Sequence, residues 1–153
     1  MEKYAILLGY FDKQQLLIQR LATELLRLEL SSWERGYVFA LKAQHLFTAV
    51  EDLLKQVAKA FENHIEDLGR SHQELLLRLH TPVPQIRPAL LSEEAFLVLD
   101  KLRTFRHFVR HGYGCELDRA ELLLLQQRLA AHFPQVEADL MAFRSYLLEL
   151  LSS

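Results

Sequence analysis

One short segment concentrates side chains that are suited to chemistry. Residues 101–111, KLRTFRHFVRH, hold one lysine, three arginines and two histidines and no carboxylate, in a chain whose formal net charge is −2. Tyr113 follows between Gly112 and Gly114. Histidine titrates near neutral pH and can act as a base or an acid, and the planar guanidinium of arginine matches phosphate oxygens. The segment is therefore a candidate site for phosphate chemistry.

RNA cleavage is the reaction that such side chains suit. The 2′-hydroxyl of RNA is an internal nucleophile, so the enzyme needs a base that deprotonates it and cations that stabilise the charge building on phosphorus. This reaction requires no metal ion, and we expect no cofactor. One copy of the segment supplies few groups, but a twofold dimer would bring two sets together across a cleft.

Helical geometry divides the segment into two faces, because successive residues of an α-helix are about 100° apart. An arc of about 60° holds the predicted core stripe, and an arc of about 140° on the opposite side holds the basic residues. This pattern predicts an exposed basic surface at a helix end, where Arg103, His107 and Arg110 would be available to contact RNA phosphates. The predicted core stripe consists of Val98, Leu102, Phe105 and Val109, and the basic set consists of Arg103, Arg106, His107, Arg110 and His111.

Two other interpretations apply to the same residues. Cations near a helix C-terminus complement the helix dipole without any further function. His107 and His111, four residues apart, could also hold a metal ion. However, no carboxylate or cysteine accompanies them within residues 101–111, and three arginines nearby would oppose a dication. We therefore expect no metal site.

Spacing adds a more specific pattern, Arg-x4-His-x-Tyr, formed by Arg106, His111 and Tyr113. In a small helical protein this motif resembles that of the HepT-like toxins of the HEPN superfamily. The context is similar too, since the motif ends a long predicted helix after a proline-containing loop, and Leu117–Asp118 then precedes another helix. The family commonly has asparagine directly after the motif arginine, where this chain has His107.

The resemblance implies a metal-independent endoribonuclease that acts as a homodimer, the toxin of a type II/VII-like toxin–antitoxin pair. Arg106 would stabilise the phosphate and the transition state, and His111 would be the general base or acid. The implied partner is a minimal nucleotidyltransferase antitoxin that adds AMP to Tyr113. Such an adduct would place an anionic phosphate where the RNA phosphate must sit.

Two competing functions remain open at this point. One is a non-catalytic helical binding module that partners a nucleotidyltransferase; such a module is expected to lack the intact Arg–His pair, which this chain keeps. The other is a helical scaffold without chemistry, for which substitution of Arg106 and His111 would change only the local charge.

Apolar residues recur at three- and four-residue spacing along nearly the whole chain, which predicts an all-α fold. We expect a single HEPN-like domain over residues 1–153, an antiparallel up-and-down bundle of four to five helices. Pro134 would kink the last helix or start a new one. The expected helices span about 3–29, 31–67, 71–79, 92–111 and 118–151, with N-caps at Ser31, Ser71, Ser92 and Asp118.

Several side chains have a predicted environment. Trp33 and Tyr37 could stack on a base, but we expect a core or interface role for them, and Glu51 is expected on a solvated helix face. The first helix is apolar enough that part of its surface is expected in a dimer interface. The second helix is expected to bury Val38, Leu41, Leu46, Val50, Leu53, Leu54, Val57 and Phe61.

Composition indicates the cellular setting. The single cysteine, Cys115, excludes an intramolecular disulfide and fits a reducing compartment. No segment approaches the roughly 20 apolar residues that span a bilayer. The sequence therefore predicts a cytoplasmic protein that does not contact a membrane.

Overall fold

The computed structural model describes residues 1–62, 72–111 and 117–153, except for the side chains of residues 108, 110 and 111. Within these ranges an isolated bridge between Val83 and Arg87 is the only extended pairing, which confirms the all-α prediction. The described helices are α1 (Glu2–Arg27), α2 (Trp33–Glu62), α3 (His72–His80), α4 (Glu93–His111) and α5 (Arg119–Ser152).

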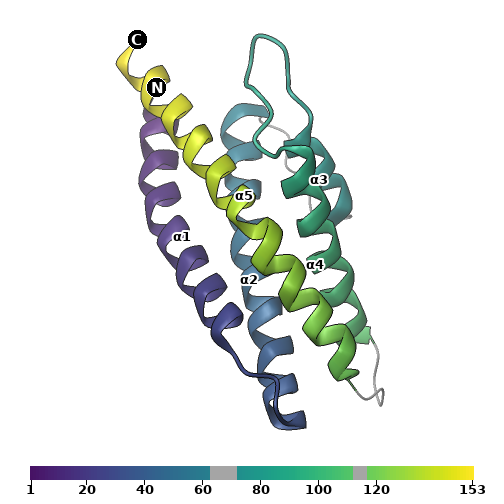
Figure 1. Ribbon diagram of the computed structural model, residues 1–153. Helices are drawn as coiled ribbons and strands as arrows, with labels where there is room; N and C mark the ends of the chain where they lie inside the picture. Colours follow the sequence, from purple (N-terminus) through teal and green to yellow (C-terminus); the bar gives the residue numbers. More distant parts are fainter. Residues whose placement is uncertain (63–71, 112–116) are drawn as a thin grey trace.

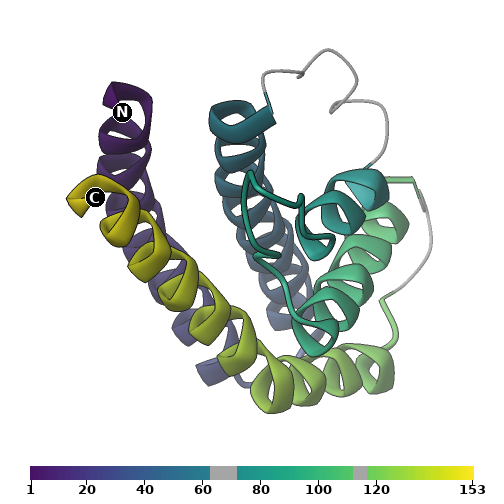
Figure 2. The same cartoon turned by 90° about the horizontal axis from the view of Figure 1, so that it is seen from above.

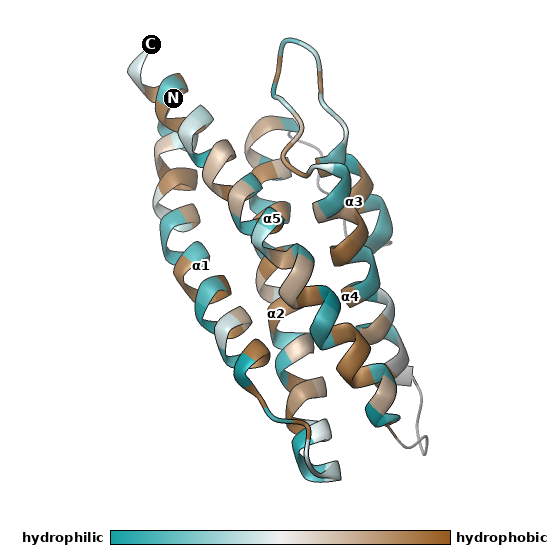
Figure 3. Ribbon diagram, viewed as in Figure 1, coloured by the Kyte–Doolittle hydropathy of each residue, from teal (hydrophilic) through white to brown (hydrophobic). Residues whose placement is uncertain are grey.

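The four long helices form an antiparallel bundle (Figure 1). α1 packs on α2, α2 on α4, α4 on α5 and α5 on α1, while the short α3 packs against α2 and α4. The start of α1 and the end of α5 lie side by side in both ribbon views (Figures 1 and 2). Hydrophobic and hydrophilic segments alternate along each helix (Figure 3), as expected for amphipathic helices around a shared core. The predicted up-and-down bundle is confirmed.

The core of α2 differs from the prediction near the start of the helix. Val38 and Leu41 are 41% and 54% exposed, so their predicted burial is wrong. Gly36 is buried instead, and a Cβ atom built on it would lie 3.1 Å from Leu122 of α5. Near its start, α2 therefore turns the face that carries Gly36 toward α5, and not the face that carries Val38 and Leu41. Phe39, Ala40 and Ala43 line that inward face, whereas Leu46, Val50, Leu53, Leu54, Val57 and Phe61 are buried as predicted.

Two predicted N-caps are confirmed and one is displaced. The Ser92 hydroxyl accepts a hydrogen bond from Ala95 N at 3.3 Å, and the Asp118 carboxylate accepts one from Ala120 N at 3.0 Å. For α2 the capping hydroxyl is Ser32, which accepts from the backbone N of the third residue of the helix, rather than Ser31. Ser71 and the predicted end of the second helix at residue 67 lie outside the described residues.

Pro134 does not start a new helix. α5 continues through it as one helix to Ser152. Figure 2 shows that α5 changes direction partway along its length, and Pro134 is an interior residue of this helix. A bend is expected there because proline lacks the N–H that would bond the preceding turn.

Side chains of α5 fix the ends of two other helices. Asp139 Oδ2 accepts hydrogen bonds from Ser92 N at 2.8 Å and from Ser92 Oγ at 2.7 Å, at the start of α4. Gln126 Nε2 donates to the carbonyl oxygens of Leu25 at 3.0 Å and Leu28 at 2.8 Å, where α1 ends. Helix ends leave such backbone groups without partners. α5 therefore fixes where α1 stops and where α4 begins.

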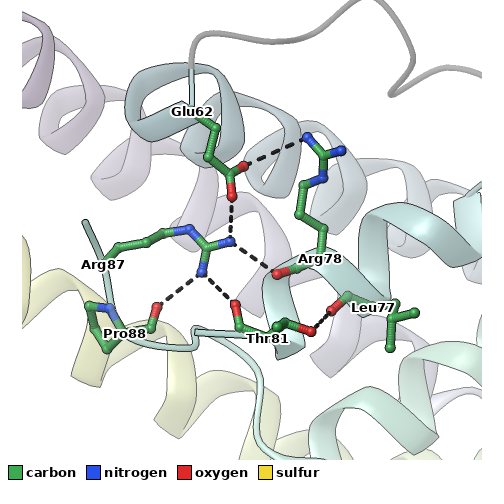
Figure 4. A network of polar contacts seen from close by, with 6 residues as sticks. All are labelled: Glu62, Leu77, Arg78, Thr81, Arg87 and Pro88. Carbon is green, nitrogen blue, oxygen red and sulfur yellow. Dashed lines mark hydrogen bonds and ion pairs between the residues drawn. The ribbon is translucent and has the colours of Figure 1, made fainter. Parts of the chain in front are cut away.

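A buried guanidinium joins α2, α3 and the loop that leads to α4 (Figure 4). The side chain of Arg87 is 0% exposed and donates to Glu62 Oε1 at 2.9 Å, at the end of α2. It also donates to the carbonyl oxygens of Arg78 at 3.0 Å, Thr81 at 3.1 Å and Pro88 at 3.0 Å. A buried charge requires such partners, so this contact sets the path of the loop before α4.

No helix in the described part of the chain is both long and apolar enough to cross a membrane.

Substitution of Arg87 by methionine should lower the free energy of unfolding by about 3–5 kcal/mol, because Glu62 and three carbonyl oxygens lose their donor. Arg78→Met is the matched control, since the Arg78 side chain is 40% exposed and its guanidinium lies 3.9 Å from the Glu62 carboxylate. Its loss should cost less than about 1 kcal/mol. Urea unfolding followed by circular dichroism measures both values. Equal costs would contradict the assigned role of Arg87.

Candidate active site

Arg106 lies on the inward side of α4 rather than on the fully exposed face that the sequence predicted. The core stripe includes Ala95 and Leu99, each 0% exposed, in addition to Val98 and Leu102. These residues widen the buried arc toward the position of Arg106, which follows Leu102 by four residues and shares its side of the helix. The structure accordingly leaves Arg106 half-buried.

The Arg106 guanidinium packs on an aromatic ring of α2. Its Cζ atom lies 5.5 Å from the centroid of the Phe47 ring, within the range of a cation–π contact. Phe47 itself is 1% exposed, so the ring is a fixed surface. Among the described residues no carboxylate forms an ion pair with Arg106. The ring contact restricts the rotamers of Arg106, and its N–H donors are not paired with any carboxylate of the described residues.

The other predicted site residues on α4 have different environments. Arg103 Nε donates to Asp100 Oδ1 at 2.8 Å, one turn earlier, and both side chains are about one-quarter exposed. His107 is exposed. His111 is the last residue of α4, but its side chain and that of Arg110 lie outside the described residues. Tyr113 lies outside them as well.

A polar pair, Glu51 and His72, lies next to the Phe47 ring and was not predicted from the sequence. The His72 ring, at the start of α3, contacts Phe47 with ring centroids 6.2 Å apart. His72 Nδ1 is hydrogen-bonded to Glu51 Oε2, and Lys55 Nζ lies 3.5 Å from Glu51 Oε1. Glu51 is 4% exposed, so its predicted place on a solvated face is wrong. Because 21 residues separate the paired side chains, no local pattern in the sequence could have revealed the contact.

These contacts form a chain from the interior to the motif arginine. The Glu51 carboxylate holds His72, the His72 ring packs on Phe47, and Phe47 supports the Arg106 guanidinium. A buried carboxylate needs partners of this kind, so the pair fixes α3 against α2. The arrangement therefore holds the Arg106 guanidinium in place at the surface of the bundle. The N–H donors of this planar group match the geometry of phosphate oxygens.

A cavity of about 340 Å³ lies on the other side of α4, toward α5. Its lining mixes Lys101 and Arg128 with Asp118 and Glu121, so it has no strong bias toward an anion. It does not include Arg106, which faces α2. In the described part of the chain no group of three or more histidine, cysteine, aspartate or glutamate side chains is placed to hold a metal ion.

Phe47→Leu should remove the aromatic surface beneath Arg106 at a cost of roughly 1–2 kcal/mol in the free energy of unfolding. The Arg106 Nε–H signal in a proton–nitrogen NMR spectrum should move, because a guanidinium above a ring experiences its ring current. Phe39→Leu is the matched control, since the Phe39 ring is also buried and packs on Phe105 rather than on an arginine. An unchanged Arg106 signal in Phe47→Leu would contradict the contact.

Comparison with known proteins assigns the family. No curated protein and no solved structure matches the sequence. The sequence model of a family described as HepT-like protein matches residues 38–147. The matched region is more than half of the chain, and it runs from near the start of α2 to near the end of α5, with Arg106, His111 and Tyr113 inside it. Family membership indicates a HEPN-type function of the toxin class. The chain belongs to the HepT-like family, and its helical bundle is the HEPN-like fold expected for that family.

Proposed function

We propose that this protein is a metal-independent endoribonuclease and the toxin of a toxin–antitoxin pair. One observation carries the proposal: the Arg106 guanidinium is held on the Phe47 ring, five residues before His111, at the end of α4 in a HepT-like chain. An arginine that is restricted in rotamer and is not paired with a described carboxylate is suited to an anion from outside the chain. An RNA phosphate is such an anion.

The reaction then follows from the two motif side chains. His111 removes the proton of the 2′-hydroxyl, and the 2′-oxygen attacks the adjacent phosphorus. The bond from phosphorus to the 5′-oxygen breaks, and that oxygen takes a proton from a second acid. Arg106 stabilises the charge that builds on the phosphate oxygens in the transition state. Neither step needs a metal ion.

The second acid is supplied by a homodimer. A twofold axis beside the motif would place the His111 of a second copy on the opposite side of the scissile phosphate. Exposed apolar side chains on the two helices that flank the motif support association with another copy, since Leu97 on α4 and Leu124 on α5 are 53% and 49% exposed. Exposed apolar groups of this size gain free energy when a partner covers them.

Arg106→Ala and His111→Ala should each lower the rate of RNA cleavage in EDTA by a factor of about 10²–10⁴, the usual range for a lost transition-state donor or general base. Arg20→Ala is the control, because Arg20 is an exposed arginine on α1, far along the chain from the motif. It should cleave like the parent. Circular dichroism and gel filtration establish that all variants keep the fold and size of the parent.

Two results would contradict the ribonuclease. The parent, free of any adduct by mass spectrometry, would leave RNA intact, or both motif variants would cleave at the parental rate. If the parent protein leaves RNA intact but binds a minimal nucleotidyltransferase tightly, the non-catalytic binding module is favoured instead.

Neutralisation is proposed to occur at Tyr113, by transfer of AMP from the nucleotidyltransferase antitoxin. The adduct would bring a phosphate next to Arg106 and His111 and so compete with RNA. Tyr113→Phe should therefore cleave RNA like the parent but stay active after co-expression with a minimal nucleotidyltransferase. Intact-mass spectrometry should find AMP on the parent and none on Tyr113→Phe. A modified parent that still cleaves at full rate would overturn this mechanism of control.

A further inference from the structure

An exposed aromatic pair marks the start of α2. The rings of Trp33 and Tyr37, one helical turn apart, meet edge to face with their centroids 5.8 Å apart. They are 72% and 51% exposed, so the core role considered for them from the sequence is wrong. Rings as exposed as these contribute little to the hydrophobic core. An exposed pair of aromatic rings is a surface on which a nucleobase can stack.

A cavity of about 530 Å³ adjoins this pair, between the start of α2 and the start of α5. This volume is within the range of small-ligand sites. Arg119 is the charged residue of the lining, and no carboxylate among the described residues forms an ion pair with it. The lining therefore combines an aromatic surface with a cation, as a nucleotide requires. It consists of Leu30, Ser31, Ser32, Trp33, Gly36, Tyr37, Leu117, Arg119 and Leu122.

The cavity lies at the same end of the bundle as the motif. Phe105 of α4 packs on Phe39 of α2, with ring centroids 6.1 Å apart. From there α4 continues to His111 toward the end at which α2 begins (Figure 1). α5 starts at Arg119, eight residues after His111. A single-stranded RNA that is bound at the end of α4 can therefore also contact the exposed Trp33 ring.

We propose that Trp33, Tyr37 and Arg119 form a binding subsite for single-stranded RNA beside the cleavage centre. One base stacks on the Trp33 ring, which Tyr37 supports, and Arg119 binds a phosphate of the same strand. This inference rests on the proposed ribonuclease function and adds to it where the uncut part of the RNA is held. Stacking tolerates any base, so the subsite strengthens binding without selecting a sequence.

The test uses a single-stranded oligoribonucleotide with 2′-O-methyl groups at every position, which the proposed reaction cannot cut. Trp33 is the only tryptophan of the chain, so its fluorescence reports on this site alone. Binding should quench it. By anisotropy of a labelled oligonucleotide, Trp33→Ala should weaken binding roughly tenfold, within the range for loss of one stacked base. Arg119→Ala should make the negative slope of log affinity against log salt shallower by about 0.7, the value for one lost phosphate contact.

Two matched variants serve as controls. Leu41→Ala removes another exposed apolar side chain of α2, and Arg20→Ala removes an exposed cation of α1. Both should bind the oligonucleotide like the parent. Loss of binding in these controls to the same extent as in Trp33→Ala would overturn the subsite.

The outcomes separate this inference from the cleavage reaction. If the parent cuts RNA but Trp33 is not quenched and Trp33→Ala binds as the parent does, the subsite is wrong and the ribonuclease stands. If the parent quenches on the 2′-O-methyl strand but does not cut RNA, the subsite is supported and the ribonuclease fails. If Trp33→Ala converts a dimer to a monomer in gel filtration, the surface is a contact between copies and the subsite is overturned.

Discussion

Within the described part of the chain, every other helix packs against α2, and the rest of the structure depends on that constraint. A helix that is covered by neighbours on several sides must be apolar around most of its circumference, and α2 buries residues along its whole length. The same helix places Phe47 beneath Arg106 and ends at Glu62, the carboxylate that receives the buried Arg87. The core helix and the support of the motif arginine are therefore one element.

Charge inside the bundle occurs at a few positions that join segments far apart in sequence. Glu51 ties α2 to His72 at the start of α3, and Arg87 ties the end of α2 to the loop that leads into α4. Buried charges are costly when unpaired, so each of these contacts specifies one arrangement of the segments that it joins. Asp139 of α5 completes the placement of α4 by binding Ser92, the N-cap of that helix. The direction of α4, and with it the place of the motif, follows from these contacts.

The sequence was sufficient for the helices and most of the core, because apolar periodicity and capping residues are local signals. It was also sufficient for the family, through the spacing of Arg106, His111 and Tyr113. It was insufficient for the face on which Arg106 lies, since Ala95 and Leu99 widen the buried stripe only once α2 is in place. The exposure of Trp33 and the burial of Glu51 likewise depend on which helix comes to lie beside them, and no short-range pattern encodes that.

The chemistry of the cut RNA ends tests the proposed ribonuclease most directly. Cleavage in EDTA of an oligonucleotide that carries a single 2′-deoxy position at its cut site decides whether the 2′-hydroxyl is the nucleophile. Attack by the 2′-hydroxyl should give 2′,3′-cyclic phosphate and 5′-hydroxyl ends from the all-ribose strand and no cut at the 2′-deoxy position. Ends that carry a 5′-phosphate, or a cut that persists at the 2′-deoxy position, would contradict it.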